Sequence, residues 1–326
     1  MAQTPPNVMR EGFVRRDATR SYLVLEVASE LVGRDEWPYR QARIDLREQG
    51  AEEWSVALFG SDGPAVIDQV ARGEVHVAIL NPAAPLALAL RGKGPFAKPI
   101  PLRAITVIPS YDQLAFAVSE RTGLRSLREI RERRFPLRVS LRGQKDHSIH
   151  LVVNEVLAAA GFSLDDIVSW GGQVRYDAGL PNNPTRVGAV ERDEADAVVD
   201  EAVRSWLNLA VQSGMRILPL DEPLLARLEE IGLRRGVISK ARFSALDQDV
   251  ATLDFSGFPV FTHANVPDGI IRSFCAALET RKNRIPWDGN KPLPLERMCR
   301  DTPEGPLNLP LHPAAEQFWR ERGYLP

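Results

Sequence analysis

The sequence predicts an α/β protein with two lobes, and its alternation of elements is the first reason. Short apolar runs of strand length, such as Val75–Leu80 and Leu102–Ile108, alternate with helix-length segments. The chain has 326 residues, which suffices for about two domains. It is 44% hydrophobic and 26% charged, a balance that lets it bury a core.

Two segments with the same order of elements predict where the chain passes between the lobes. Leu114–Ile130 and Phe258–Leu278 each read as an apolar strand, a polar loop and a helix. We expect each to mark a crossing. The first lobe is then discontinuous, residues 1–117 with 258–326, and residues 118–257 form an inserted second lobe.

The first part of the chain contains a strand–helix–strand unit. Residues 1–15 are polar and aperiodic, and we expect them to be disordered. Apolar periodicity then predicts a helix at Ser21–Leu31, strands at Tyr39–Arg47 and Trp54–Phe59, a helix at Pro64–Arg72, strands at Val75–Leu80, Leu102–Ile108 and Leu114–Val118, and a basic helix around Leu124–Ile130. The arginines of that last helix alternate with glutamates, which is typical of a solvated face.

The rest of the chain continues the alternation. Gly161 is expected to close one helix as a left-handed cap, and Gly171 and Gly172 to form a turn. The pattern predicts strands ending near Leu141 and at Ala195–Val199, Arg216–Leu220 and Phe258–Thr262, and helices at Ile149–Ala160, Val187–Arg192, before Gln212, at Asp221–Leu233, Gly269–Glu279 and His312–Arg322. Ile285–Pro310 is rich in proline and reads as irregular.

The loop between Leu141 and Ile149 predicts a site for an anion. It brings the cations Arg142 and Lys145 and the hydroxyl of Ser148 to the start of a helix. Helix N-termini present free N–H groups and a positive dipole end. The alternative interpretation is an ordinary loop in which Asp146 or Ser148 caps the helix.

Polar residues also follow other predicted strands. Ser61 and Asn81 lie after two strands of the first lobe, and Asp200 and Glu201 lie after a strand of the second. Ligands of open parallel sheets bind beyond the carboxyl ends of strands. The alternatives are a helix N-cap for Ser61, a turn residue before proline for Asn81, and a dipole-complementing acid for one of Asp200 and Glu201.

Several stretches in order resemble one known family, the TAXI solute receptors of TRAP transporters. The resemblance covers most of the chain from about residue 50, and it rests on Gly73–Ile79, Leu102–Tyr111, Leu124–Leu127, Ala195–Ala197 and Leu311–Ala315. It implies a type II periplasmic-binding-protein fold, with a ligand cleft between lobes joined by hinge strands. It also implies TRAP-type membrane permease subunits as partners.

The resemblance further implies a small anionic solute, either a carboxylate or an amino-acid-like molecule, clamped by hinge closure. Mapped onto this sequence, the family's ligand positions fall on Ser61, Asn81, Tyr111, Arg142, His147, Ser148, Asp200 and Glu201. Arg142 is suited to grip a carboxylate with two hydrogen bonds, and Asp200 or Glu201 to take an ammonium or hydroxyl group.

Other kinds of chemistry find little support. Lys and Arg number 41 against 43 Asp and Glu, so the chain has no excess positive charge to attract nucleic acid. Phosphate-binding and serine-nucleophile motifs are absent from the sequence, and we expect no cofactor. His147 and His150, with Asp146, lack a further metal ligand nearby, so we expect no metal.

Two functions from different classes remain open. The first is binding without catalysis, as a receptor or sensor that closes around a solute. The second is a cytoplasmic enzyme on the same fold, such as a decarboxylase or lyase of a carboxylic acid. In the second, Arg142 would hold the substrate carboxylate and His147 would be the candidate acid or base, because histidine titrates near neutral pH. The first is preferred, since no convincing catalytic set accompanies His147.

The sequence also bears on the cellular compartment and on the state of the two cysteines. The first residues contain no apolar signal segment, so the sequence as it stands predicts a cytoplasmic protein, with the periplasm as the alternative if a leader was removed. No apolar run is long enough to span a membrane. Cys275 and Cys299 are expected to be free buried thiols, although one bridge is open in an oxidising compartment.

Overall fold

The computed structural model describes residues 18–34, 41–47, 55–287 and 291–326. The predicted disorder of residues 1–15 lies outside this range. The chain divides into two compact units, Met1–Arg40 and Gln41–Pro326. The described part of the first unit contains helix α1, Thr19–Val32, which confirms the predicted helix. Everything below concerns the second unit.

One five-stranded sheet forms the first lobe. Its strand order is β1-β2-β3-β12-β4, with β1 at Ala42–Arg47, β2 at Ser55–Ser61, β3 at Val77–Leu80, β12 at Phe258–His263 and β4 at Leu102–Ile108. Strands β2 and β3 are parallel and joined by helix α2, Ala65–Ala71, which confirms the predicted strand–helix–strand unit. Strand β12 runs antiparallel to β3 and β4.

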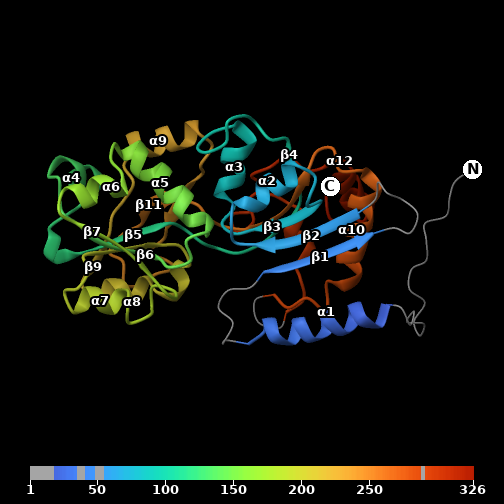
Figure 1. Cartoon of the computed structure of the whole chain (residues 1–326), viewed down its shortest axis with the longest axis horizontal. Helices are drawn as coiled ribbons and strands as arrows, with labels where there is room; N and C mark the ends of the chain where they lie inside the picture. The colour runs from blue at the N-terminus through green and yellow to red at the C-terminus, as the bar shows by residue number, and fades with distance from the viewer. Residues whose placement is uncertain (1–17, 35–40, 48–54, 288–290) are drawn as a thin grey trace, which may run out of the picture. The chain divides into compact units, whose positions relative to one another are not determined.

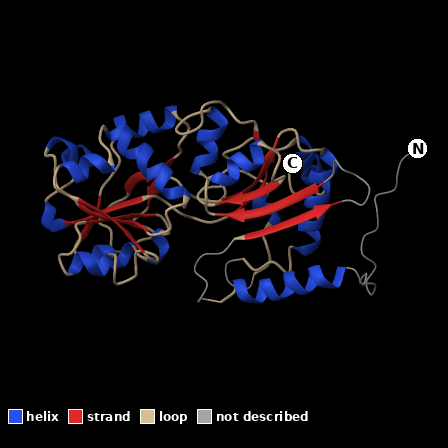
Figure 2. Cartoon of the chain, viewed as in Figure 1, coloured by secondary structure: helices blue, strands red, loops and turns tan. Residues whose placement is uncertain are grey.

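A second five-stranded sheet forms the other lobe (Figures 1 and 2). Its order is β7-β6-β8-β5-β9, with β7 at Gln173–Asp177, β6 at Arg138–Arg142, β8 at Ala197–Asp200, β5 at Ala115–Ser119 and β9 at Met215–Ile217. Strands β6, β7 and β8 are parallel, and β5 runs antiparallel to its neighbours.

The two sheets confirm the predicted two-lobe α/β architecture. The predicted crossing segments each supply a strand that runs antiparallel to both of its neighbours, β5 in the second sheet and β12 in the first. The lobe boundaries at residues 117 and 258 stay a prediction, and β5 belongs wholly to the second sheet.

Helices surround both sheets. The described ones in the second unit, besides α2, are α3 at Ala84–Arg91, α4 at Leu127–Glu132, α5 at Ser148–Ala160, α6 at Leu164–Ser169, α7 at Val187–Glu191, α8 at Leu207–Gln212, α9 at Glu222–Glu230, α10 at Asp268–Arg281, α11 at Leu295–Met298 and α12 at Pro313–Glu321. Helix α11 corrects the expectation that Ile285–Pro310 is irregular throughout. Helices α3 and α6, strand β7 and a hairpin of β10, Arg235–Ile238, and β11, Val250–Leu253, were not predicted.

Two predicted glycine positions are confirmed by the backbone. Gly161 ends α5 with a φ of 86°, in the left-handed region. Gly172 lies in the turn before β7, where a Cβ atom would come within 2.5 Å of the Leu137 carbonyl oxygen. Only glycine fits such a close backbone approach.

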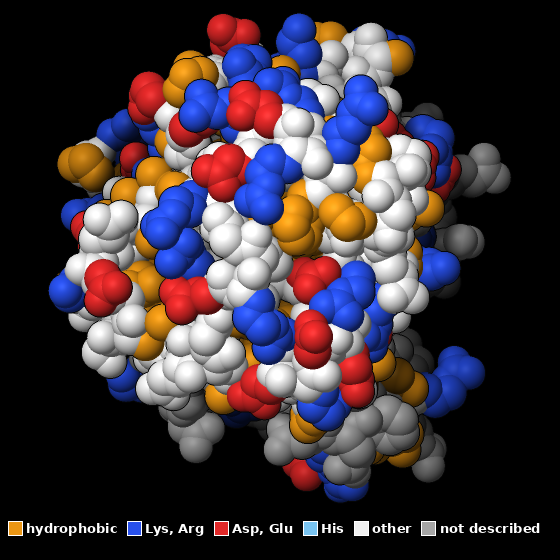
Figure 3. All heavy atoms as spheres, turned by 90° about the vertical axis from the view of Figure 1, so that its left-hand side faces the viewer, with side chains coloured by type: hydrophobic (Ala, Val, Ile, Leu, Met, Phe, Trp, Pro, Cys, Tyr) orange, Lys and Arg blue, Asp and Glu red, His pale blue; other side chains and the backbone are white. Residues whose placement is uncertain are grey.

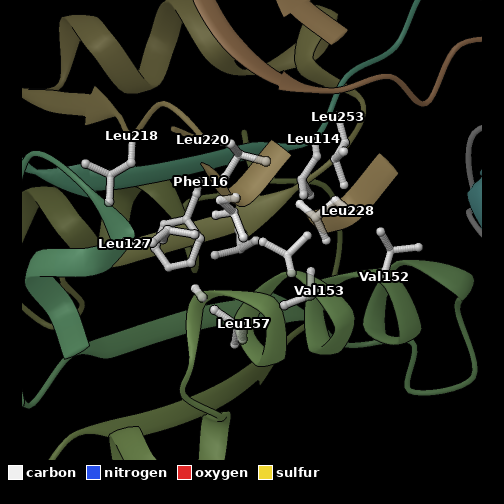
Figure 4. Close-up of a cluster of buried hydrophobic side chains, with 14 of the residues drawn as sticks. Leu114, Phe116, Leu127, Val152, Val153, Leu157, Leu218, Leu220, Leu228 and Leu253 are labelled. Carbon is white, nitrogen blue, oxygen red and sulfur yellow. The ribbon is translucent and has the colours of Figure 1, made fainter. Parts of the chain in front are cut away.

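The core of the second lobe lies between α4, α5, α9 and the sheet. Figure 4 shows Phe116 of β5, Leu127 of α4, and Val153 and Leu157 of α5 gathered in one buried cluster. Leu127, Val153 and Leu157 lie in helices predicted from their apolar spacing, and Phe116 lies in a predicted strand. On the face drawn in Figure 3, positive and negative side chains are interspersed, without a continuous area of one sign.

Candidate functional site

Polar side chains from both lobes meet where four strands end. In the first sheet β2 ends at Ser61, and Asn81 follows β3. In the second sheet β6 ends at Arg142, and β8 ends at Asp200, with Glu201 next. The Asn81 amide nitrogen lies 3.4 Å from Glu201 Oε1, which joins residues 120 positions apart in the sequence.

Asp200 is fully buried and held by two arginines. Its Oδ1 accepts hydrogen bonds from Nε and Nη2 of Arg142, at 3.1 and 2.7 Å, and from the backbone N–H of Glu201 at 2.8 Å. Its Oδ2 accepts one from Nη1 of Arg186, which is itself fully buried. We call Arg142, Arg186 and Asp200 the paired arm. Burial opposes the ionisation of Asp200, but the two guanidinium groups outweigh it and hold the pKa of that carboxyl below its usual value.

Glu201 is buried beside it with far weaker contacts. Its Oε1 lies 3.4 Å from Arg142 Nη2, 3.4 Å from the Asn81 amide and 3.5 Å from His147 Nε2. Glu201 Oε2 and Asn81 Oδ1 are buried without any partner in the structure. We call Glu201 and Asn81 the open arm.

Burial raises the pKa of Glu201 well above its usual value, and the nearby Asp112 and Asp200 raise it further, whereas Arg142 lowers it. The distance to Arg142 is that of an ion pair, yet the raised pKa indicates a neutral carboxyl. We favour the neutral form, because Arg142 lies closer to Asp200 and shares its charge there.

His147 supports the helix that follows. Its Nδ1 accepts a hydrogen bond from the backbone N–H of Ile149 at 3.2 Å, so His147 is the N-cap of α5. This corrects the alternative in which Asp146 or Ser148 caps that helix. Its Nε2 lies 3.1 Å from Arg142 Nη1. Burial, aided by the Arg142 charge, lowers the pKa of His147 to about 3, which makes the ring a weak proton acceptor near neutral pH.

Ser148 ties the two lobes together. Its backbone N–H and its hydroxyl both donate to the carbonyl oxygen of Asp62, at 2.9 and 2.8 Å. Ser61, the residue before Asp62, accepts a hydrogen bond from the Gly63 N–H at 3.1 Å. Helix α3 adds apolar contacts, because Ala84 and Leu88 belong to the same buried cluster as the core of α5.

The meeting point is closed to solvent in this structure. The side chain of Arg142 is 11% exposed, and those of Asp200 and Glu201 are at most 2% exposed. A solute can therefore reach these groups only when the lobes separate. The predicted grip of Arg142 on a solute carboxylate is not open here, because its Nε and Nη2 are bonded to Asp200.

Two further residues belong to this cluster, and the sequence did not point to them. Arg186 is one. The other is Asp112, whose carboxylate accepts from the backbone N–H groups of Gln113, Ala202 and Val203 at 2.8, 2.9 and 3.2 Å. Burial raises the pKa of Asp112 to about 6.

Asp112 also fixes the backbone next to Glu201. Ala202 adopts a φ of 56°, in the left-handed region that alanine rarely occupies, and its N–H is held by Asp112. The indole N–H of Trp206 donates to the Glu201 carbonyl at 2.7 Å. These contacts hold Glu201 in place even though its own carboxyl is poorly bonded.

Tyr111 lies apart from the other predicted residues. Its hydroxyl donates to the Val237 carbonyl at 2.9 Å, and the Arg242 guanidinium stacks 4.3 Å from its ring centre. It lines a pocket of about 550 Å³ with residues that include Arg204, Trp287 and Glu304. No hydrogen bond or ion pair between Tyr111 and the paired or open arm is found among the described residues.

Metal and membrane features were also assessed over the described residues. No group of three or more His, Cys, Asp or Glu side chains among them is arranged to hold a metal ion. His147 and His150 are among the residues covered by this statement. Within residues 18–34, 41–47, 55–287 and 291–326, no helix has the length and apolar character needed to cross a bilayer. Cys275 and Cys299 are free and buried, as expected.

A family model describes most of the chain. The model of the NMT1-like family matches residues 56–323. This range contains all the residues of the paired and open arms. No curated protein matches the chain significantly.

Solved structures with limited similarity include proteins named as binding proteins or receptors. The periplasmic aliphatic sulphonate binding protein of Escherichia coli is 17% identical, with a TM-score of 0.34, over 68% of this chain and 62% of that one. The alkanesulfonate-binding protein of Xanthomonas axonopodis pv. citri, bound to MOPS, is 14% identical, with a TM-score of 0.29, over 67% and 80%.

A third structure is the L-cystine solute receptor of Neisseria gonorrhoeae in its unliganded open conformation. It is 12% identical, with a TM-score of 0.27, over 66% of this chain and 65% of that one. The chain thus spans less than two thirds of the length of the first and third of these proteins. Scores this low carry no argument about its solute.

Proposed function

Because the chain belongs to the NMT1-like family, we propose that it is a solute-binding protein that encloses a small organic solute between its two lobes. The lobes are linked by the segments that lead into β5 and β12, and these segments act as the hinge. Opening separates Ser148 from Asp62 and Asn81 from Glu201. Closure around the solute restores equivalent contacts on both sides.

One observation carries the proposal. Buried polar groups from both lobes converge at the lobe contact, and some of them, Glu201 Oε2 and Asn81 Oδ1, have no partner. A purely structural interface pairs its buried polar atoms, because an unpaired one costs about 1–3 kcal/mol. Gln69, Gln113 and His312 also have a buried atom without a partner, but Glu201 and Asn81 bring such atoms from both lobes to one point, which supports a place for a third molecule.

The finer assignment follows the sequence resemblance. We propose that the chain is a receptor of the TAXI kind, that its solute is a carboxylate or an amino-acid-like molecule, and that TRAP-type permease subunits are its partners. The motifs at Gly73–Ile79 and Ala195–Ala197 support this proposal. Cell fractionation with an antibody to the chain distinguishes the cytoplasm from the periplasm as its compartment.

The enzyme alternative gains no support from the site. Its candidate acid or base, His147, caps α5 through one ring nitrogen and contacts Arg142 through the other. Burial also lowers the pKa of His147 to about 3. A decarboxylase or lyase would need this ring free to exchange a proton with a substrate.

A thermal-shift screen against carboxylic and amino acids tests the binding proposal. A solute present at 100 times its dissociation constant should stabilise the protein by about 2.7 kcal/mol. Substitution Asn81→Ala should weaken the binding of that solute, because Asn81 contributes from the first lobe. Asn265→Ala, at an exposed position, is the matched control and should leave binding unchanged.

Two results would count against the proposal. Binding that is equal in the Asn81→Ala variant and in the control would place the solute elsewhere. Disappearance of the solute during incubation, followed by chromatography, would instead favour an enzyme.

A further inference from the structure

The unpartnered atoms at or just beyond the ends of β3, β6, β7 and β8 are all of one kind. Besides Glu201 Oε2 and Asn81 Oδ1, the structure leaves Gln144 Oε1 and Asp177 Oδ2 buried and without partners. Gln144 follows the end of β6, and Asp177 ends the neighbouring strand β7. The amide oxygens of Asn81 and Gln144 and Oδ2 of Asp177 accept hydrogen bonds, and Glu201 Oε2 accepts one once its carboxyl is ionised. A solute that satisfies all four atoms therefore donates hydrogen bonds and binds with Glu201 ionised.

The carboxyls of the cluster also outnumber its guanidiniums. Its buried carboxyls are Asp112, Asp200 and Glu201, whereas its buried guanidiniums are only Arg142 and Arg186. Both guanidiniums are already bonded to Asp200. The Asp112 carboxylate accepts hydrogen bonds from three backbone N–H groups. Of the three carboxyls, only that of Glu201 therefore has an oxygen without a hydrogen-bond partner.

We propose that the solute carries a protonated nitrogen with N–H groups, and that this cation binds Glu201 Oε2 and Asn81 Oδ1. The class comprises primary and secondary amines, amidines and guanidines, including amino acids. A carboxylate in the same molecule is not required. This inference rests on the proposed function and narrows its solute class. When the cation binds, Glu201 gives up its proton to solvent, so the buried pair carries no added net charge.

Proton release makes the proposal testable through pH. The charged and titratable groups facing Glu201 are Arg142 from β6, Asp200 from β8, Asp112 from the hinge segment, Asp62 from the loop before α2, and His147 at the start of α5. A cation should bind more tightly as pH rises, because the deprotonation of Glu201 that accompanies binding costs less free energy at higher pH. A plain carboxylate should bind more weakly as pH rises, because it would meet that developing charge.

The experiment uses matched probes that differ only in their charged groups. One set is γ-aminobutyrate, butylamine and butyrate, and a second is phenylalanine, phenethylamine and hydrocinnamate. Titration calorimetry on the full chain, in two buffers of different ionisation enthalpy, gives affinity and proton release together. We expect the amine-bearing members to bind at least about tenfold more tightly than the matched carboxylates, with proton release.

Substitution Glu201→Gln removes the charge but keeps the shape. We expect it to weaken the binding of the amine-bearing probes by at least about tenfold and to abolish proton release. Glu194→Gln, at an exposed ion pair, is the matched control and should change neither. Circular dichroism of both variants establishes that they fold.

The outcomes separate this inference from the proposed function. If butyrate or hydrocinnamate binds as tightly as its amine counterpart, or if Glu201→Gln leaves amine binding unchanged, this inference is overturned while solute binding stands. If none of the probes and none of the screened acids binds, the proposed function fails, and this inference fails with it.

Discussion

Asp200 of the paired arm and Glu201 of the open arm are adjacent in the sequence, yet their carboxyl groups have opposite surroundings. Asp200 receives hydrogen bonds from two arginines and a backbone N–H, whereas Glu201 has only contacts of 3.4 Å or longer at one oxygen and none at the other. Both side chains are almost entirely buried. The difference teaches that burial and charge alone do not mark a binding group. The unmet hydrogen-bonding capacity does, because it must be satisfied by something that arrives later.

The two arms therefore have different tasks. Asp200, with Arg142 and Arg186, links β6, β8 and the start of α7, which fixes the second lobe at its binding edge. Glu201 and Asn81 come from different lobes, so their contact exists only when the lobes are closed. The first arm serves stability, and the second serves binding.

The largest expected effect comes from breaking the paired arm. Arg186→Met keeps most of the side-chain volume but leaves Asp200 with one guanidinium in a fully buried position. We expect the free energy of unfolding to fall by about 3–5 kcal/mol, measured by urea denaturation. Arg192→Met, at an exposed pair with Glu194, should have no measurable effect. Equal stability of the two variants would mean that the paired arm is not structural.

A substitution in the open arm should raise the free energy of unfolding, whereas the substitution in the paired arm lowers it. Glu201→Gln replaces a buried, poorly bonded carboxyl by a neutral amide that can also donate. We expect the free energy of unfolding at neutral pH to rise by about 1–2 kcal/mol in the absence of solute. Asp200→Asn, the matched variant of the paired arm, should lower it. A loss of stability in Glu201→Gln would show that Arg142 pairs with Glu201 after all.

The pH dependence of stability separates the same two carboxyls. The folded pKa of Glu201 is raised above the ordinary 4.5, so its contribution to stability is present below that pH and is lost as pH rises through the folded pKa. The folded pKa of Asp200 is lowered from 3.8, so its contribution is present above that pH and is lost as pH falls. The stability advantage of Glu201→Gln should accordingly grow from pH 4.5 upward, as measured by thermal unfolding in a series of buffers. An advantage that is constant with pH would contradict the assignment.

Most of the fold followed from the sequence because its pattern is local. Strand β4 begins and ends where the apolar run predicted, and α5 carries the predicted apolar face. Helix α3 was missed for a physical reason. It is buried on nearly every side, with Leu88 in one core cluster and Leu86 in another, so it shows no amphipathic period.

The site followed in part, because the carboxyl ends of strands can be located without knowing the contacts. This rule placed Asn81 at a strand end of the first lobe and Asp200 and Glu201 at a strand end of the second, and the structure brings them together. It could not find Arg186, a lone arginine that resembles a surface residue until its contact with Asp200 is known. It also could not tell which carboxyl already has its hydrogen bonds satisfied, since that depends on contacts between residues 14 to 90 positions apart.

Substitution of Tyr111 should have the smallest effect on stability of the variants considered. It also tests whether the solute site extends to the hinge segment. The sequence resemblance placed this residue at the solute, but in the structure it packs against Arg242 and bonds to Val237. Tyr111→Phe removes the hydroxyl with its backbone hydrogen bonds to Val237 and Ser239, at a half-buried position, and should lower the free energy of unfolding by about 0.5–1 kcal/mol. Because its ring lies apart from the open arm, solute affinity measured by calorimetry should stay within about twofold of the unmodified protein. Asn81→Ala should do the reverse, with a larger loss of affinity than of stability. A loss of affinity in Tyr111→Phe comparable to that in Asn81→Ala would mean that the solute extends to the hinge, and the division between a binding arm and the surrounding structure would have to be redrawn around Tyr111.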